Sequence, residues 1–322
     1  MKSFKALLII NPISGTHTKD SIEPLVKKRL SMLGWDIEVR YTTCHGDATR
    51  LAGEAVSRGF NAVLAAGGDG TINETAMALR DTPVPLGILP CGSGNGLARH
   101  LGIPIDISEA LDVISQEHIT AADYGMVNRQ PFFCTFGVGF DAAVSETFAR
   151  QKRRGKLSYI RSAINEYVKY HPEVYSIMAN GVEITRKAFL VAVCNASQYG
   201  NNAYIAPEAS ITDGLLDITI VQSGSPLLTA KMGLDMMTGY INSNTLITTL
   251  RVSNATISRT ADGPAHIDGE PVHMDNVMEI ECHRQSLRVF TPEHHERFRP
   301  LITPVNSLLA DLRHSINHLF GL

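Results

Sequence analysis

The first 120 residues alternate short apolar runs with segments of helical spacing, and few folds accommodate this pattern. Four runs have the length and composition of strands: residues 6–10, 35–41, 62–66 and 84–89. Helical patterns lie between them, over residues 19–33, 47–58 and 71–80. Strands and helices that take turns in this way form βαβ units around a mostly parallel sheet. We therefore predict an α/β domain over residues 1–124.

The sequence changes character after this point. Apolar runs follow one another with few helical segments between them, at residues 132–136, 174–178, 190–194, 215–221 and 251–257. One helix is predicted over residues 155–170, and another begins at Pro226, where Ser225 serves as the capping residue. Short strands at this density favour a β-rich second domain over residues 125–294. Residues 305–320 carry apolar side chains at helical spacing, which suits packing against the protein or contact with a membrane.

Composition narrows the class of protein. With 44% hydrophobic and 19% charged residues, the 322-residue chain has the make-up of a globular protein with room for two cores. Its net charge of −3 provides no general attraction to nucleic acid, so no such partner is expected. No apolar run approaches the roughly 20 residues that cross a bilayer. The five cysteines are scattered without a paired motif, so we expect a soluble, cytoplasmic protein with reduced thiols.

Glycine- or asparagine-rich turns follow three of the predicted strands, at residues 11–15, 67–71 and 92–96. Ligands of open α/β sheets bind beyond the carboxyl ends of the strands. The turn Gly67-Gly68-Asp69-Gly70-Thr71 opens a predicted helix, whose free N–H groups favour an anion, and its glycines let the backbone approach phosphate closely. A carboxylate beside phosphate raises the electrostatic energy unless it binds a metal or takes a proton, and both tasks occur in phosphoryl transfer. The alternative is a glycine-rich turn in which Asp69 is only a cap.

The third turn adds polar groups to the same predicted edge of the sheet. Ser93 is suited to donate its hydroxyl proton to a phosphate, and Asn95 is suited to cap the next helix or to orient the first loop. Neither turn has the P-loop pattern with its lysine, and the glycine spacing does not fit a dinucleotide-binding fingerprint. A phosphate site of another kind is therefore predicted.

Several motifs occur together in one order, at residues 42–48 (TTCHGDA), 67–74 (GGDGTINE), 87–95 (GILPCGSGN), 101–104 (LGIP), 137–142 (GVGFDA), 213–217 (DGLLD) and 267–271 (IDGEP). In this combination the chain resembles the diacylglycerol kinase catalytic-domain family, which groups bacterial soluble lipid kinases with sphingosine kinases. The resemblance implies a nucleotide domain, a sandwich-like second domain and an active site in the cleft between them. It also implies that the C-terminal segment, from about residue 295 to 322, packs back on the first domain.

The same resemblance implies roles for individual residues. ATP would be contacted by the turns of the first domain and by one aspartate of the second: Asn11, Thr42, Gly67, Gly68, Asp69, Gly70, Thr71, Asn73, Ser93, Asn95 and Asp268. Glu270 or Asp69 would be the catalytic base, and Asp69 would organise Mg²⁺ with help from Asp123 through water. Asp141 would meet the polar head of the acceptor. A structural metal would be held by Asp213 and the carbonyl groups of Ser210 and Leu215.

One position departs from the family pattern. Bacterial diacylglycerol kinases usually have aspartate where this chain has Gly96, whereas small residues there are typical of sphingosine-kinase-like members. The acceptor is therefore open between a diacylglycerol and a sphingoid-type lipid alcohol. The expected partners are a lipid substrate and, transiently, a membrane surface, and the family allows a homodimer. The alternatives are an NAD kinase-like phosphotransferase and a non-catalytic regulator that binds nucleotide or lipid.

Overall fold

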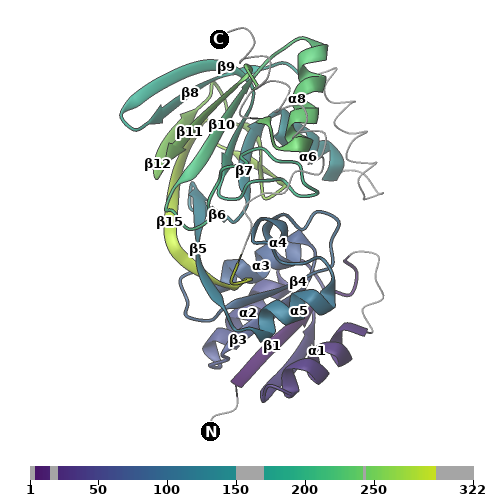
Figure 1. The fold of residues 1–322 in the computed structure, drawn as a ribbon. Coiled ribbons are helices and arrows are strands. Elements are labelled where there is room, and N and C mark those ends of the chain that lie inside the picture. The colour runs from purple at the N-terminus through teal and green to yellow at the C-terminus, as the bar shows by residue number, and fades with distance from the viewer. Residues whose placement is uncertain (1–3, 15–20, 150–169, 242–243, 295–322) are drawn as a thin grey trace.

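Two long strands, β5 (Ile119–Val127) and β15 (Val277–Phe290), connect the two domains of the molecule (Figure 1). The computed structural model describes residues 4–14, 21–149, 170–241 and 244–294. The two strands pair antiparallel with each other, and Val289 near the end of β15 pairs with Leu86 in the first domain. The strands of both domains thereby join into one continuous hydrogen-bonded sheet.

The first domain is built on a parallel sheet, as the alternating pattern predicted. Its strands lie in the order β2 (Trp35–Tyr41), β1 (Phe4–Ile10), β3 (Ala62–Gly67) and β4 (Leu86–Pro90). The helices of this domain are α1 (Ile22–Ser31), α2 (Asp47–Ser57), α3 (Asp69–Leu79), α4 (Gly96–His100) and α5 (Ile107–Ser115). Every side chain of β3 is buried, which is typical of a parallel strand whose sheet is covered on both faces.

The second domain is a β-sandwich with antiparallel pairing, in which two described helices are packed. Its further strands are β6 (Gln130–Phe132), β7 (Thr135–Gly139), β8 (Glu173–Ala179), β9 (Val182–Cys194), β10 (Leu216–Gln222), β11 (Ile247–Val252), β12 (Asn254–Ser258), β13 (Gly263–Ile267) and β14 (Glu270–Met274). The helices are α6 (Phe140–Ala149) and α8 (Pro226–Thr238), and Ser225 caps α8 as predicted. Figure 1 shows both helices in the upper domain, together with these strands.

Two predicted strands are each divided in the structure. The run at residues 132–136 breaks at Phe133 and Cys134, because their backbone N–H groups turn toward the carboxylate of Asp268 instead of a neighbouring strand. The run at residues 251–257 breaks at Ser253, where the chain leaves its partner β10 and joins β8 and β15. Periodicity alone does not reveal either break, because the apolar pattern continues through it.

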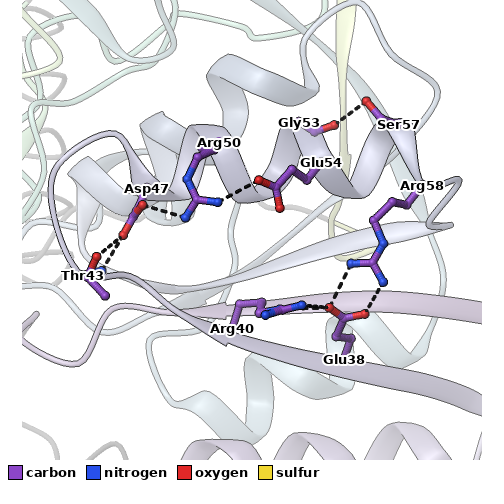
Figure 2. Close-up of polar contacts among 9 residues, drawn as sticks. All are labelled: Glu38, Arg40, Thr43, Asp47, Arg50, Gly53, Glu54, Ser57 and Arg58. Atoms are coloured by element: carbon purple, nitrogen blue, oxygen red, sulfur yellow. Dashed lines mark hydrogen bonds and ion pairs between the residues drawn. The ribbon is translucent and has the colours of Figure 1, made fainter.

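An ion pair links the end of α2 to the edge strand β2, and hydrogen bonds from Thr43 to Asp47 link the start of α2 to the turn before it (Figure 2). Arg58 forms two hydrogen bonds with Glu38, and with Arg40 it lowers the pKa of that carboxyl to about 2. The Thr43 hydroxyl, followed by Arg50, holds the pKa of Asp47 well below its usual range. The arginine side chains are exposed, so we expect these ion pairs to orient α2 and to contribute little to the stability of the protein.

Some predictions fall outside the described residues. These are most of the helix at residues 155–170, the apolar tail at residues 305–320 and the return of residues 295–322 to the first domain. Among the residues that are described, no helix is both long and apolar enough to span a membrane.

Candidate active site

The two glycine-rich loops of the first domain lie against each other. The N–H of Cys91 donates to the carbonyl oxygen of Gly67 over 2.7 Å. A β-carbon on Gly92 would lie 2.7 Å from the Cα of Gly68, which is closer than such contacts allow. A β-carbon on Gly67 would lie 2.4 Å from that of Thr71. Glycine at these positions therefore lets two backbone segments meet in front of the first turn of α3, where N–H groups without helical partners favour an anion.

Asp69 joins the two loops. Its Oδ2 accepts a hydrogen bond from the Asn95 N–H (2.8 Å), and its Oδ1 accepts one from the Gly96 N–H (2.7 Å). The carboxylate thus lies at the N-terminus of α4 while its own residue begins α3. A β-carbon on Gly94 would lie 2.7 Å from Oδ2, so a larger residue there would displace the carboxylate. The predicted roles of Asp69 in catalysis and metal binding stay predictions, and the structure adds a loop-joining role.

The other predicted nucleotide contacts surround these loops. The Asn11 amide donates to the Thr71 hydroxyl over 2.9 Å, which ties the end of β1 to the first turn of α3. Asn95 exchanges two hydrogen bonds with the backbone of Gly92, so its side chain closes the second loop. The side chain of Ser93 is exposed, whereas Thr42, Gly68, Gly70 and Asn73 are half-buried. This arrangement leaves Ser93 accessible for a phosphate oxygen.

Glu74 is a site residue to which the sequence analysis gave no role. Its carboxylate accepts from the N–H groups of Gly46 (2.9 Å) and Ala48 (3.1 Å), and it lies 3.0 Å from His45. It thereby holds the turn after Thr42 against α3, the helix that follows the first glycine loop. The helical spacing between residues 70 and 74 was a visible signal, because it puts both residues on one face of α3.

Glu270 reaches this site from the second domain. It begins β14 directly after the two-residue turn Asp268-Gly269, in which both residues have positive φ (51° and 84°), as this hairpin geometry requires. The Glu270 side chain is exposed, and its Oε1 lies 3.3 Å from the position of a β-carbon on Gly70. The structure therefore brings the second predicted carboxylate next to the first glycine loop.

Asp268 fixes the position of that turn. Its carboxylate accepts hydrogen bonds from three consecutive N–H groups, those of Phe133 (2.9 Å), Cys134 (2.7 Å) and Thr135 (2.8 Å). Its predicted contact with ATP stays a prediction, and the structure adds that both of its oxygens are engaged with the backbone between β6 and β7. Asp268 thereby anchors the hairpin that carries Glu270.

The buried carboxyl of Asp268 makes the stability of the protein depend on pH. Burial raises its pKa to about 6, against the effect of the three N–H donors, from 3.8 in the unfolded chain. Because the folded state then binds the proton more tightly, this contribution is full below about pH 4 and is lost as the pH rises through about 6. We expect it to amount to about 3 kcal/mol. Asp268→Asn should therefore flatten the dependence of the unfolding free energy on pH between about pH 4 and 6, measured by urea denaturation.

Asp217 provides the internal comparison for this prediction, because burial also raises its pKa to about 6. Asp217→Asn should remove a slope of the same sign, and the double variant should remove both. A wild-type curve and an Asp268→Asn curve that run parallel would contradict the assignment.

Asp141, the predicted acceptor contact, lies in a buried polar network at the start of α6. Its Oδ2 accepts from the hydroxyl of Tyr199 (2.9 Å) and lies 3.1 Å from the Nε2 of His266, while its Oδ1 accepts from the Ala142 N–H (2.8 Å). Asp141 is 5% exposed and His266 1%. The sequence analysis did not identify Tyr199 or His266, because they come from segments far apart in the chain and belong to no motif.

A loop of the second domain, residues 197–202, lies against the second glycine loop. The N–H of Asn201 donates to the carbonyl oxygen of Gly94 (3.2 Å), and the N–H of Ser197 donates to Nδ1 of His100 (3.1 Å). A β-carbon on Gly200 would lie 3.1 Å from the Cα of Gly94. The two domains are thus in direct contact beside the loop that Asp69 orients.

Asp213, which was predicted to hold a structural metal, forms an ion pair with Arg251. One oxygen of Asp213 accepts from the N–H of Leu215, and the other forms an ion pair with the guanidinium of Arg251. Ser210, three residues before Asp213 in the chain, is buried, and its hydroxyl oxygen lies 3.5 Å from that of Thr212. A guanidinium therefore neutralises this carboxylate, and the structural metal site implied at Asp213, Ser210 and Leu215 stays a prediction.

Asp123, on β5, contacts the same turn. Its oxygens accept from the N–H groups of Gly214 (2.6 Å) and Gln285 (2.7 Å), so this fully buried carboxylate joins β5, the Asp213 turn and an irregularity in β15. Its predicted help in holding metal-bound water stays a prediction.

Magnesium has to be considered separately from that turn. In the part of the chain that the structure describes, no three His, Cys, Asp or Glu side chains cluster as a metal cage would require. Magnesium that accompanies a nucleotide, however, is usually held by one or two carboxylates together with phosphate oxygens. Asp69, between the two loops, fits as one such carboxylate.

Comparison with known proteins places both domains. Residues 5–127 match the diacylglycerol kinase catalytic domain, and residues 134–291 match the YegS C-terminal NAD kinase beta sandwich-like domain. A probable lipid kinase YegS-like of Pectobacterium atrosepticum is 34% identical, over 74% of this chain and 81% of the relative. The diacylglycerol kinase of Bacillus subtilis is 29% identical, over 83% of this chain and 89% of the relative.

Solved structures agree with this placement. A putative diacylglycerol kinase from Bacillus anthracis superposes with a TM-score of 0.73 at 26% identity, over 91% of this chain and all of that one. A second structure described in the same way gives a TM-score of 0.76 at 24% identity, over 91% and 99%. With both domains matched in order and most of a 34% identical relative covered, the chain belongs to the diacylglycerol kinase family and is similar to its YegS-like lipid kinases.

Proposed function

We propose that this protein is an ATP-dependent lipid kinase that transfers the γ-phosphate to the hydroxyl group of a lipid alcohol. The observation that carries the proposal is the position of Glu270, a carboxylate of the second domain whose Oε1 lies next to Gly70 of the first. An exposed carboxylate beside a predicted phosphate loop suits a base that removes a proton from an attacking hydroxyl. The names of the relatives support the kinase class and a lipid acceptor.

In this proposal Asp69 and Glu270, the two candidates for the catalytic base, have different roles. Both oxygens of Asp69 accept backbone N–H groups, which orients the second loop and draws electron density from the carboxylate. Glu270 is exposed to an entering substrate. Glu270 therefore accepts the proton in this proposal, whereas Asp69 shapes the phosphate site. Mg²⁺, when bound with the nucleotide, supplies positive charge to the phosphate oxygens.

The acceptor side is formed by the second domain. In this proposal Asp141 accepts a hydrogen bond from the polar head of the lipid, as the resemblance implied. A lipid with two acyl chains or a long alkyl chain is presented by a membrane or micelle surface, so transient contact with such a surface belongs to the same proposal.

A labelled-phosphate assay tests this function. The purified protein is incubated with ATP labelled in the γ-phosphate and with dioctanoylglycerol, monoacylglycerol, sphingosine, ceramide or a prenol in mixed micelles. A parallel reaction contains NAD. We expect label in at least one lipid and none in NADP. Robust formation of NADP without a labelled lipid would replace this proposal with the NAD kinase-like alternative, and no transfer at all would favour the regulator.

A further inference from the structure

The carboxylate of Asp141 is held by more groups than a helix cap needs. A carboxylate offers about four acceptor positions, two on each oxygen. Tyr199 and His266 occupy both positions of Oδ2, and the Ala142 N–H occupies one on Oδ1. Among the contacts of the described residues, this leaves one acceptor position, and it is on Oδ1.

The backbone provides space for this arrangement at Gly137. A β-carbon there would lie 2.3 Å from Oδ2 of Asp141 and 2.4 Å from Nε2 of His266. Any residue other than glycine would therefore separate the two side chains. The rings of Tyr199 and His266 also contact each other edge to face, with centroids 5.9 Å apart.

The hydrogen bonds of His266 define which ring nitrogen carries the proton. The N–H of Gly269 donates to Nδ1 over 3.4 Å, so Nδ1 is an acceptor and the proton of the neutral ring is on Nε2. Nε2 then donates to Oδ2 of Asp141. Gly269 belongs to the turn that precedes Glu270, so the imidazole connects Asp141 to the proposed base.

Tyr199 connects Asp141 to the other side of the site. It lies in the loop of residues 197–202, in which Asn201 donates to the carbonyl oxygen of Gly94. Asp141 is therefore connected through His266 to the Glu270 turn and through Tyr199 and its loop to the phosphate-loop region.

We propose that Tyr199 and His266 are positioning residues that direct the free acceptor position of Asp141 Oδ1 toward the lipid hydroxyl region, in register with Glu270 and the Gly94 loop. The inference rests on the proposed function, since it takes Asp141 as the residue that binds the acceptor. It adds that only one oxygen of Asp141 receives the acceptor and that two side chains outside the motifs set its direction.

Three variants separate this role from a purely structural one. Tyr199→Phe removes one donor to Asp141 and keeps the ring. His266→Asn places an acceptor near the Nδ1 position and loses the donor at Nε2, whereas His266→Gln places an amide donor near the Nε2 position. We expect Tyr199→Phe and His266→Asn each to lower kcat/KM for the lipid about tenfold, as the loss of a hydrogen bond to a charged group does. The KM for ATP should stay within about twofold, and His266→Gln should recover most of the loss.

Several results would overturn the inference. One is unchanged kcat/KM for the lipid in both Tyr199→Phe and His266→Asn. Another is a parallel loss for ATP and lipid that follows the loss of thermal stability, which marks a structural role only. A third is a kcat/KM for the lipid that stays near wild type in His266→Asn and falls in His266→Gln. The contact of His266 with Gly269, and not its contact with Asp141, would then be the one that matters.

A spectroscopic measurement keeps the network testable without activity. Nitrogen-15 NMR of the histidine rings should show that the neutral His266 ring carries its proton on Nε2. A ring protonated at Nδ1 would overturn the inference. If the NMR result holds while no lipid is phosphorylated, the proposed function fails and the positioning role fails with it, but the hydrogen-bond network stands.

Discussion

Glu270→Gln is expected to lower kcat for lipid phosphorylation by about 10²- to 10⁴-fold, the range typical for loss of a general base. Glutamine has nearly the same shape, but its amide cannot take a proton from the attacking hydroxyl. Because the Glu270 side chain is exposed, the unfolding temperature and the KM for ATP should change little. Initial rates at saturating ATP and lipid, together with thermal unfolding of the same preparations, provide the measurement.

The matched control is Glu279→Gln, which changes an exposed glutamate on β15 of the same domain. It removes the same charge away from the glycine loops and should leave kcat unchanged. Equal rates for wild type and Glu270→Gln would remove Glu270 from the proton transfer and would return Asp69 to consideration as the base.

Asp69→Ala is expected to lower kcat/KM for ATP at least about 10²-fold, because two charge-assisted hydrogen bonds that orient the second glycine loop are lost together. The free energy of unfolding should also fall by about 1–3 kcal/mol, since the N–H groups of Asn95 and Gly96 lose their acceptors. Steady-state kinetics with varied ATP and urea denaturation measure the two effects separately.

Two further variants test whether the loss of activity in Asp69→Ala comes from the displaced glycine loop or from a general loss of stability. Gly94→Ala keeps the carboxylate and adds a β-carbon 2.7 Å from its Oδ2, so it should raise the KM for ATP in the same direction as Asp69→Ala. Asp106→Ala removes another helix-capping carboxylate, at α5, where it accepts from the N–H groups of Ser108 and Glu109. It should cost about 1 kcal/mol of stability and leave the KM for ATP unchanged. Full activity in Asp69→Ala would contradict the loop-joining role and any catalytic one.

Local pattern was sufficient for much of the first domain. The predicted strand at residues 35–41 coincides with β2, and the predicted helix at residues 47–58 agrees with α2 to within one residue. The strand depends on the alternation of apolar and polar side chains, and the helix depends on apolar spacing and on the closing Gly59, which are properties of adjacent residues. The glycine loops were likewise visible, because a strand, a turn and a helix follow one another directly there.

Contacts between distant segments could not be read in this way. Asp69 was recognised as a carboxylate near phosphate, but its hydrogen bonds to residues 95 and 96 depend on how two βα units pack. The resemblance implied that Asp268 lies near the nucleotide, but its hydrogen bonds to three N–H groups of the β6–β7 connection depend on contacts between distant segments. Arg251 near Asp213 was also invisible, because the pairing of β10 with β11 brings it there.

The residues that contact Asp141 could not be identified from the sequence either. Tyr199 and His266 are 58 and 125 residues away in the chain, and neither stands at a motif position that implies chemistry. Only the sandwich, by pairing β7 with β13, places His266 directly opposite Gly137 and beside the start of α6. Their contribution to the site is therefore a consequence of the sheet register.

The central claim is that the two domains form one site in which Glu270 activates a lipid hydroxyl beside the phosphate loops. The most direct measurement follows the γ-phosphate label of ATP into the organic extract, with wild type and Glu270→Gln side by side at the same protein, ATP and lipid concentrations. The account predicts label in the organic phase for wild type and about 10² times less or lower for Glu270→Gln. Label that stays in the aqueous phase for both proteins, or that enters the organic phase equally, would contradict it.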